Sequence, residues 1–188
     1  MKRILNRMTL LLIHLVLCNS LFAEEFFAKQ PILITSAGQS GDVLMAKILA
    51  QKANLQFTYD NLAKAERIKN HATLIIVCGG SSKGLGAAKI DKDQEIARVQ
   101  ALISEAKKAN LKILVMHLGG KARRGQLSDE FNKIAADNAD YLIVVKSGDE
   151  DRFFSDIAEQ KKIRLALIEK IMDASDYLKK IFVEEKKH

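Results

Sequence analysis

Residues 72–89, with the sequence ATLIIVCGGSSKGLGAAK, combine a short apolar run with a turn rich in glycine and hydroxyl groups. The apolar run, Leu74 to Val77, is rich in β-branched residues and predicts a strand buried on both faces. In an open parallel sheet, the loop after such a strand lies at the carboxyl edge, where ligands bind. The glycines let the backbone turn, and Ser81, Ser82 and Lys83 offer donors to a polar or anionic group. This stretch therefore predicts both the fold class and a candidate site.

The alternation of apolar strand and amphipathic helix continues along the whole chain. Strands are expected at residues 32–35, 55–59, 74–77, 113–116, 141–145 and 163–168. Helices are expected at residues 43–53, 61–70, from 91 onward, from 128 onward, 153–160 and 173–183. This pattern predicts an α/β fold, a three-layer αβα sandwich around a doubly wound parallel sheet of five or six strands. We expect the flavodoxin-like strand order 2-1-3-4-5, with the sixth strand at an edge.

Helix ends and helix faces can also be predicted locally. Ser40 or Gly41 is the expected N-cap of the helix at 43–53, and Asp91 with Gln94 predicts a capping box. The glycine-rich turn after the third strand is expected to delay the next helix until Asp91. The helix at 43–53 is expected to bury Leu44, Ile48 and Leu49, with Ala46, Ala50 and Ala53 at close contacts.

The first 23 residues have the order of a secretory signal peptide. Lys2, Arg3 and Arg7 precede the apolar run 10–17, and Ala23 offers a small residue before two glutamates. The apolar run is too short for a confident membrane span. We therefore expect cleavage after Ala23, a single α/β domain at residues 24–188, and no stable membrane insertion. The expected location is periplasmic or extracellular, and the alternative is anchoring by an uncleaved N-terminal segment.

Composition excludes several classes of protein. The whole chain has a net charge of +7, which falls to +4 without residues 1–23, because that segment holds three basic and no acidic residues. No basic block is interleaved with aromatic residues, so nucleic acid is not an expected partner. The histidines have no ligand spacing and only Cys78 follows residue 23, so we expect no metal and no intrachain disulfide.

Three loops follow the first, third and fourth strands, at residues 36–42, 79–89 and 117–126. With the expected strand order, the first two flank the point where the winding direction reverses and should face each other. Hydroxyls, backbone N–H groups and guanidinium forks suit a small polar or anionic molecule, such as a carboxylate or a sugar acid. The candidate ligand-binding residues are Ser36, Gly38, Gln39, Ser40, Gly79, Gly80, Ser81, Ser82, Lys83, His117, Arg123 and Arg124.

Catalytic signatures in these loops are incomplete. Gly80, Gly84 and Gly86 have the spacing of the short-chain dehydrogenase turn, but no tyrosine has a lysine four residues later. We therefore expect no nicotinamide cofactor, and no other cofactor is indicated. A phosphate-loop pattern fails because Gly84 follows Lys83 instead of preceding it. Residues 38–42 resemble a nucleophile elbow, with an aspartate in place of the second glycine.

The predicted function is a binding module for a small polar or anionic ligand at the carboxyl edge. The alternative is a hydrolase or transferase that uses Ser40 or Ser81 with His117. That alternative needs a positioned base and an orienting acid, and the sequence shows no such triad. A helix-capping role for Ser40 and a backbone-bonded role for His117 are the simpler interpretations.

Three stretches together carry a resemblance to a known family. They are ILITSAGQSGDVLMAK at 32–47, IIVCGGSSKGLGAAKID at 75–91 and HLGGKARRGQLSD at 117–129. With the secretory leader, they resemble a bacterial exported family described only as a domain of unknown function, DUF6305. The resemblance covers nearly all of the chain after residue 23. It implies a single flavodoxin-like or Rossmann-like domain, and it implies no reaction.

Overall fold

Two buried runs of the sequence form neighbouring strands at the centre of a sheet. In the computed structural model, which describes residues 26–183, every residue of β1 (Ile32–Ala37) and β3 (Thr73–Cys78) is buried. The two strands pair in parallel along their whole length. Burial on both faces explains why residues 32–34 and 74–78 are apolar without alternating with polar residues.

Four further strands complete the sheet, and all of its strands run parallel. They are β2 (Phe57–Tyr59), β4 (Lys112–His117), β5 (Tyr141–Val145) and β6 (Arg164–Ile168). The order is β2-β1-β3-β4-β5-β6, which confirms the predicted flavodoxin-like arrangement. The sixth strand is formed and lies at an edge, as expected.

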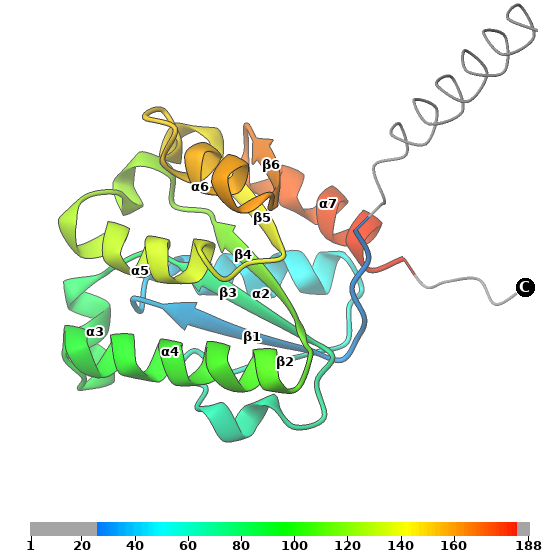
Figure 1. Cartoon of the computed structure of the whole chain (residues 1–188), viewed down its shortest axis with the longest axis horizontal. Coiled ribbons are helices and arrows are strands. Elements are labelled where there is room, and N and C mark those ends of the chain that lie inside the picture. Colours follow the sequence, from blue (N-terminus) through cyan, green and yellow to red (C-terminus); the bar gives the residue numbers. More distant parts are fainter. Residues whose placement is uncertain (1–25, 184–188) are drawn as a thin grey trace, which may run out of the picture.

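Helices cover both faces of the sheet (Figure 1). The α-helices are α2 (Asp42–Lys52), α3 (Ser82–Ala88), α4 (Lys92–Lys108), α5 (Gln126–Ala136), α6 (Phe153–Lys161) and α7 (Ala174–Ile181). Single 3-10 turns are η1 (Ala65–Ile68), η2 (Gly120–Arg123), η3 (Lys146–Gly148) and η4 (Ile171–Asp173). The core on one face includes residues of α4, α5 and α6, and the core on the other includes residues of α2 and α7. No helix within residues 26–183 has both the length and the apolar character needed to cross a membrane.

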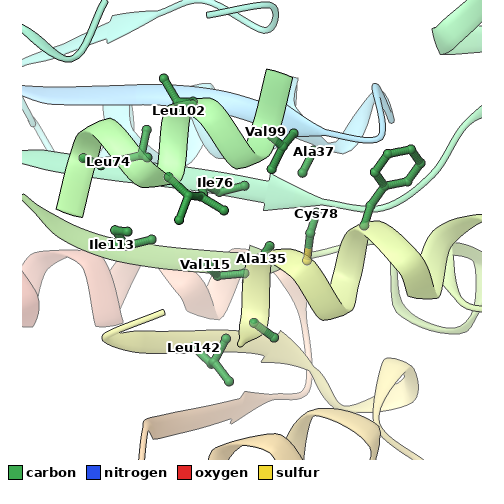
Figure 2. Close-up of a cluster of buried hydrophobic side chains, with 14 of the residues drawn as sticks. Ala37, Leu74, Ile76, Cys78, Val99, Leu102, Ile113, Val115, Ala135 and Leu142 are labelled. Carbon is green, nitrogen blue, oxygen red and sulfur yellow. The ribbon is translucent and has the colours of Figure 1, made fainter. Parts of the chain in front are cut away.

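The core beneath α4 and α5 is built from side chains of the central strands (Figure 2). Leu74 and Ile76 of β3 lie beneath α4, where Val99 and Leu102 pack against them. Cys78, the last residue of β3, lies near Ala135 of α5 and is fully buried. The core therefore extends to the carboxyl ends of the strands, directly beneath the loops that were predicted to bind a ligand.

The buried face of α2 differs from the prediction. Leu44 and Ile48 are exposed, at 52% and 47% of their surface, and were expected to be buried. The buried side chains are those of Val43, Ala46, Leu49 and Ala50. Apolar residues on α2 are numerous enough to form two alternative stripes, and packing against the sheet selects the stripe richer in small residues.

The connection from β2 to β3 and the start of α3 also differ from the predictions. Residues 61–70 do not form a helix beyond the single turn η1. The glycine-rich turn does not delay a helix until Asp91, because α3 begins at Ser82, with only three residues between it and the end of β3. Asp91 begins α4 instead, with the predicted capping box to Gln94. The predicted signal peptide at residues 1–23 lies outside the described residues.

Candidate functional site

The loops after β1 and β3 face each other at the carboxyl edge of the sheet. Gln39 and Gly80 form an isolated antiparallel bridge between them. Ser81 N–H donates to the Gly38 carbonyl at 2.8 Å, and Gly79 N–H donates to the Ala37 carbonyl at 2.9 Å. This confirms the predicted juxtaposition of residues 36–42 and 79–89. It also shows that backbone donors of these loops bond to the neighbouring loop.

The glycines of these loops make room for other parts of the chain. Gly38 has a φ of +97°, and a Cβ there would lie 2.6 Å from the Gly79 carbonyl oxygen. A Cβ on Gly84 would lie 1.9 Å from the carbonyl oxygen of Gln39. A Cβ on Gly80 would approach Leu127 of α5 to 2.9 Å. These three glycines therefore permit close packing of loops and helices, and the space beside them is not available to a ligand.

A buried carboxylate holds the β1 loop in place. Glu95 of α4 is fully buried, and its Oε1 accepts the Gly38 N–H at 2.9 Å and the Gln39 side-chain amide at 3.0 Å. Its Oε2 accepts Nε of Arg98 at 2.7 Å, which neutralises the buried charge. A buried carboxylate is stable only with such partners. Glu95 therefore positions the loop, and sequence reasoning missed it.

The partners of Arg98 and Gln39 extend this network to neighbouring segments. The Arg98 guanidinium donates to the backbone carbonyls of Ser36 and Ala63. The Gln39 amide donates to the Asn61 carbonyl at 3.0 Å and accepts from the Asn61 side chain at 3.2 Å. Gln39 was predicted to bind a ligand, but its side chain is engaged by the protein itself.

Ser40, Asp42 and Arg123 form a polar cluster at the first turn of α2. The Ser40 hydroxyl donates to Asp42 Oδ2 at 3.0 Å, and Arg123 Nε donates to the same oxygen at 3.0 Å. Ser40 is almost fully buried and does not cap α2, whose N-cap is Gly41 without a side-chain bond. Of the two predicted N-caps, Gly41 is therefore confirmed and Ser40 is not, and the Ser40 hydroxyl donates to the Asp42 carboxylate instead.

The side chain of Arg123 crosses the ends of β3 and β4 to reach this cluster. A Cβ on Gly119 would lie 2.0 Å from Arg123 Cγ and 2.6 Å from Asp42 Oδ2, so only glycine leaves room for the arginine stem. Gly79 contacts the same stem from the β3 side. Among residues 26–183, only Nε of the Arg123 guanidinium has a hydrogen-bond partner, and the side chain is 31% exposed. Its two Nη groups are therefore open to an additional acceptor.

Arg124 was predicted to bind the ligand, and the structure gives it a different role. Its guanidinium pairs with Asp129 of α5 at 2.7 Å and with Asp151 at 2.8 Å, and it also donates to the Gly148 carbonyl. It lies 4.4 Å from the ring centroid of Phe153. The hydrogen bond from Arg124 lowers the pKa of Asp151 to about 2. Arg124 thus fastens the loops after β4 and β5 together and has little capacity left for an anion.

His117 ends β4 in a fully buried position beside Cys78. Its Nε2 is 3.1 Å from the Gly120 carbonyl oxygen, its Nδ1 is 4.0 Å from Cys78 Sγ, and its ring packs on Phe154. Burial lowers the pKa of His117 and raises the pKa of the Cys78 thiol. Within the described part of the chain, His117 makes no hydrogen bond to a serine. The backbone-bonded interpretation of His117 is the one that the geometry supports.

The remaining predicted residues divide into buried and exposed ones. Ser81 is the N-cap of α3, with its hydroxyl accepting the Gly84 N–H at 3.0 Å. Ser82 and Lys83 are exposed on the first turn of that helix. Ser36 is buried at the end of β1, and its hydroxyl has no hydrogen-bond partner among residues 26–183. Lys83 is therefore, besides Arg123, a basic side chain of these loops that is exposed to solvent.

Of two site residues that sequence reasoning missed, Glu95 has a signal in the sequence and Ser128 has none. Glu95 stands four residues before Val99 and seven before Leu102, so it falls on the apolar stripe of α4. A charged residue on such a stripe predicts a buried ion pair, and Arg98 one turn later is its natural partner. Ser128, whose hydroxyl accepts the Gly80 N–H at 3.0 Å, has no comparable signal because a helical serine is usually exposed.

Comparisons with known proteins identify a family and weak structural similarities. A family model described as "Domain of unknown function (DUF6305)" matches residues 29–182, so the chain belongs to this family. No curated protein matches the chain.

Solved structures with some similarity include a GDSL-like lipase from Bacteroides thetaiotaomicron, with 10% identity and a TM-score of 0.35. That alignment covers 71% of this chain, and the chain spans only 65% of the lipase. AlinE4, an SGNH-hydrolase family esterase, has 11% identity, coverage of 87% and 86%, and a TM-score of 0.33. Similarity at this level supports no inference about function.

Proposed function

We propose that this DUF6305 domain is an exported module that binds a small carboxylate at the carboxyl edge of its sheet. The observation that carries the proposal is the position of Arg123, whose aliphatic stem lies across Gly79 and Gly119 and whose guanidinium reaches Asp42 in the first turn of α2. This is the point where the winding direction of the sheet reverses, between β1 and β3. Two Nη groups without a partner in the described residues can donate to one carboxylate.

Neighbouring groups support an anion of low charge. The first turn of α2 has backbone N–H groups without intrahelical acceptors and a positive end of the helix dipole. Lys83 adds a solvent-exposed positive charge nearby on α3. Asp42 already shares the Arg123 guanidinium, which disfavours a highly charged ligand. A monocarboxylate or a sugar acid therefore fits the site better than a polyphosphate.

Export is supported by the sequence of the first 23 residues. The basic, apolar and small-residue order is typical of a signal peptide with cleavage after Ala23. Amino-terminal sequencing of protein from a periplasmic fraction should find Glu24 as the first residue. An intact residue 1 on such protein would favour the alternative, an uncleaved anchor.

The hydrolase or transferase alternative has less support. Ser40 donates to Asp42, Ser81 accepts from Gly84 as a helix cap, and His117 bonds to the Gly120 carbonyl. A serine nucleophile needs a base within hydrogen-bond distance. A turnover of p-nitrophenyl acetate that Ser40→Ala abolishes would revive this alternative.

Titration with glucuronate and acetate tests the binding proposal. Isothermal titration and thermal shift should detect glucuronate binding to the wild type, and Arg123→Gln should weaken it about tenfold, because one charge-assisted contact is lost. Arg67→Gln provides the matched control, because Arg67 is an exposed arginine of η1 that pairs with Asp60 and makes no hydrogen bond to either loop among the described residues. Equal affinity of the wild type and Arg123→Gln, or no binding of either carboxylate at millimolar concentration, would refute the proposal.

A further inference from the structure

A hollow at the opposite edge of the sheet is lined largely by aromatic rings. It has a volume of about 510 Å³ and is lined by residues of the lead-in to β1, the starts of β5 and β6 and the end of α7. The lead-in and the end of α7 lie side by side in Figure 1. Phe26, Phe27, Tyr141 and Tyr177 contribute rings to its wall. A pocket for a small molecule has a volume of roughly 300–1,000 Å³ and a mostly apolar lining. The hollow therefore has the size and lining of a binding site.

The wall of this hollow is held together by specific contacts. Ala28 N–H donates to the Ile181 carbonyl at 2.9 Å, which ties the lead-in to the last turn of α7. The rings of Phe26 and Tyr141 lie 5.1 Å apart, and Lys112 approaches the Phe26 ring to 5.9 Å. The pKa of Tyr141 is raised, mainly because its hydroxyl is partly buried. The aromatic wall is thus a packed part of the fold.

Two cations line the same hollow without an acidic partner. Arg164 begins β6 and Lys180 lies on α7, and neither forms an ion pair within residues 26–183. Neighbouring carboxylates in the sequence are already used, because Asp140 lies 3.9 Å from Lys112 and Asp176 lies 3.5 Å from Lys179. No acidic residue is present in the lining that the structure describes. Among residues 26–183, the hollow therefore combines an apolar wall with two cations that have no acidic partner.

We propose that this hollow binds an amphipathic monoanion, such as a medium-chain fatty acid or an aromatic acid. The apolar part would lie against Phe26, Phe27 and Tyr177, and the anionic head would face Arg164 and Lys180. Aromatic rings contribute apolar contact area, and the two cations select an acid over a neutral amphiphile. The site is separate from the carboxyl edge and does not depend on the function proposed there.

Fluorescence titration with anilinonaphthalene sulfonate, followed by displacement with laurate, tests this site. The wild type should bind one equivalent of the dye, and laurate below its micellar concentration should displace it. Arg164→Gln with Lys180→Gln should weaken laurate binding about tenfold, because two partly exposed charge contacts are lost. Phe27→Ser should weaken it as well, and since Phe27 is 46% exposed, the fold does not depend on its ring.

Matched controls separate a specific site from general attraction of anions. Lys64→Gln with Lys69→Gln removes the same charge from exposed positions outside the hollow and should leave laurate affinity unchanged. Dodecyl maltoside, which has the same chain and no charge, should bind the wild type and the Arg164 and Lys180 double variant equally. Failure of laurate to displace the dye, or an equal loss in both double variants, would overturn the proposal. Binding to phosphatidylglycerol vesicles without binding to monomeric laurate would also overturn it, in favour of a membrane surface.

Discussion

The two edges of the sheet differ in how the chain uses the space around its strand ends. At the carboxyl edge, Gly38, Gly80 and Gly84 are covered by the neighbouring loops and by α5, and Glu95 accepts the Gly38 N–H. At the amino edge, a hollow of about 510 Å³ remains between the lead-in and α7, and one of about 560 Å³ remains between the lead-in and residues 54–56 before β2. Glycine-rich loops after central strands therefore do not by themselves create an open site, because small residues admit neighbouring loops as readily as ligands.

The largest effect is expected from the buried carboxylate beneath the carboxyl edge. Glu95→Leu leaves Arg98 buried without its counter-ion and Gly38 N–H without its acceptor. Loss of one member of a buried pair should lower the free energy of unfolding by about 3–5 kcal/mol. Urea denaturation followed by circular dichroism measures this loss.

Glu105→Leu on the same helix is the matched control. Glu105 is 44% exposed and lies 3.7 Å from Lys108, so its loss should change the unfolding free energy by less than about 1 kcal/mol. Similar values for the two variants would show that the β1 loop does not depend on the Glu95 network.

Two glycines of α3 test whether this helix packs closely against the loop after β1. Gly84→Ala places a Cβ 1.9 Å from the Gln39 carbonyl and should cost about 1–3 kcal/mol of unfolding free energy. Gly86→Ala meets no atom within 4 Å, and the higher helix propensity of alanine should stabilise the protein by up to about 1 kcal/mol. Equal urea midpoints of the two variants would show that Gly84 is not needed for close packing against the loop after β1.

The buried His117 predicts a pH dependence of stability. Burial lowers its pKa in the folded state, while the unfolded chain has a pKa of about 6.5. Its stabilising contribution is therefore complete above about pH 6.5 and is lost as the pH falls toward the lower folded pKa. The slope contributed by this one group is at most about 1.4 kcal/mol per pH unit.

Urea denaturation between pH 8 and pH 5 isolates this contribution when the wild type is compared with His117→Gln. The difference in unfolding free energy between the two proteins should shrink as the pH falls below about 6.5. A constant difference across this range would mean that His117 takes up a proton equally in both states.

The ion pair between Arg124 and Asp151 predicts a smaller effect at more acidic pH. The pKa of Asp151 is lowered to about 2, so its stabilisation is present above its unfolded pKa of about 3.9 and is lost as the pH falls toward 2. Because Asp151 is 64% exposed, the stability gain should stay below about 1 kcal/mol. Carboxyl NMR titration should show a midpoint near 2 that returns toward about 3.9 in Arg124→Gln, and an unchanged midpoint would contradict the pair.

The smallest effect is expected at the amino edge. Phe27→Ser removes an exposed ring from the wall of both hollows and should change the unfolding free energy by no more than about 0.5 kcal/mol. A loss above about 2 kcal/mol would show that this edge is as tightly packed as the carboxyl edge. Thermal and urea denaturation of the wild type and Phe27→Ser measure the difference in unfolding free energy.

Local sequence signals predicted much of the fold correctly. The strand order, the edge position of β6 and the capping box at Asp91 were all predicted, because hydrophobic periodicity and capping act over a few residues. The buried face of α2 was predicted wrongly. Leu44 and Ile48 are spaced as one helical stripe and Val43 and Ala46 as another, so helical periodicity fits both stripes equally well. Only contact with the sheet distinguishes such stripes.

For the candidate site, the sequence located the loops but not the partners of their side chains. It predicted that residues 36–42 and 79–89 meet, since parallel strands deliver successive loops to the same edge. It did not distinguish Arg123 from Arg124, which are adjacent in the chain. Arg124 is engaged by two carboxylates from α5 and the β5–α6 loop.

The sequence by itself therefore determined the order of elements, the sheet topology and the edge at which the loops after β1, β3 and β4 converge. Tertiary structure alone decided which polar groups remain open there, because hydrogen-bond partners such as Glu95, Asn61 and Ser128 come from segments distant in sequence. Each buried donor must find an acceptor, and the chain supplied most of them itself. Among residues 26–183, the two Nη groups of Arg123 have no partner, because Gly119 and Gly79 let the arginine stem cross the strand ends to the surface.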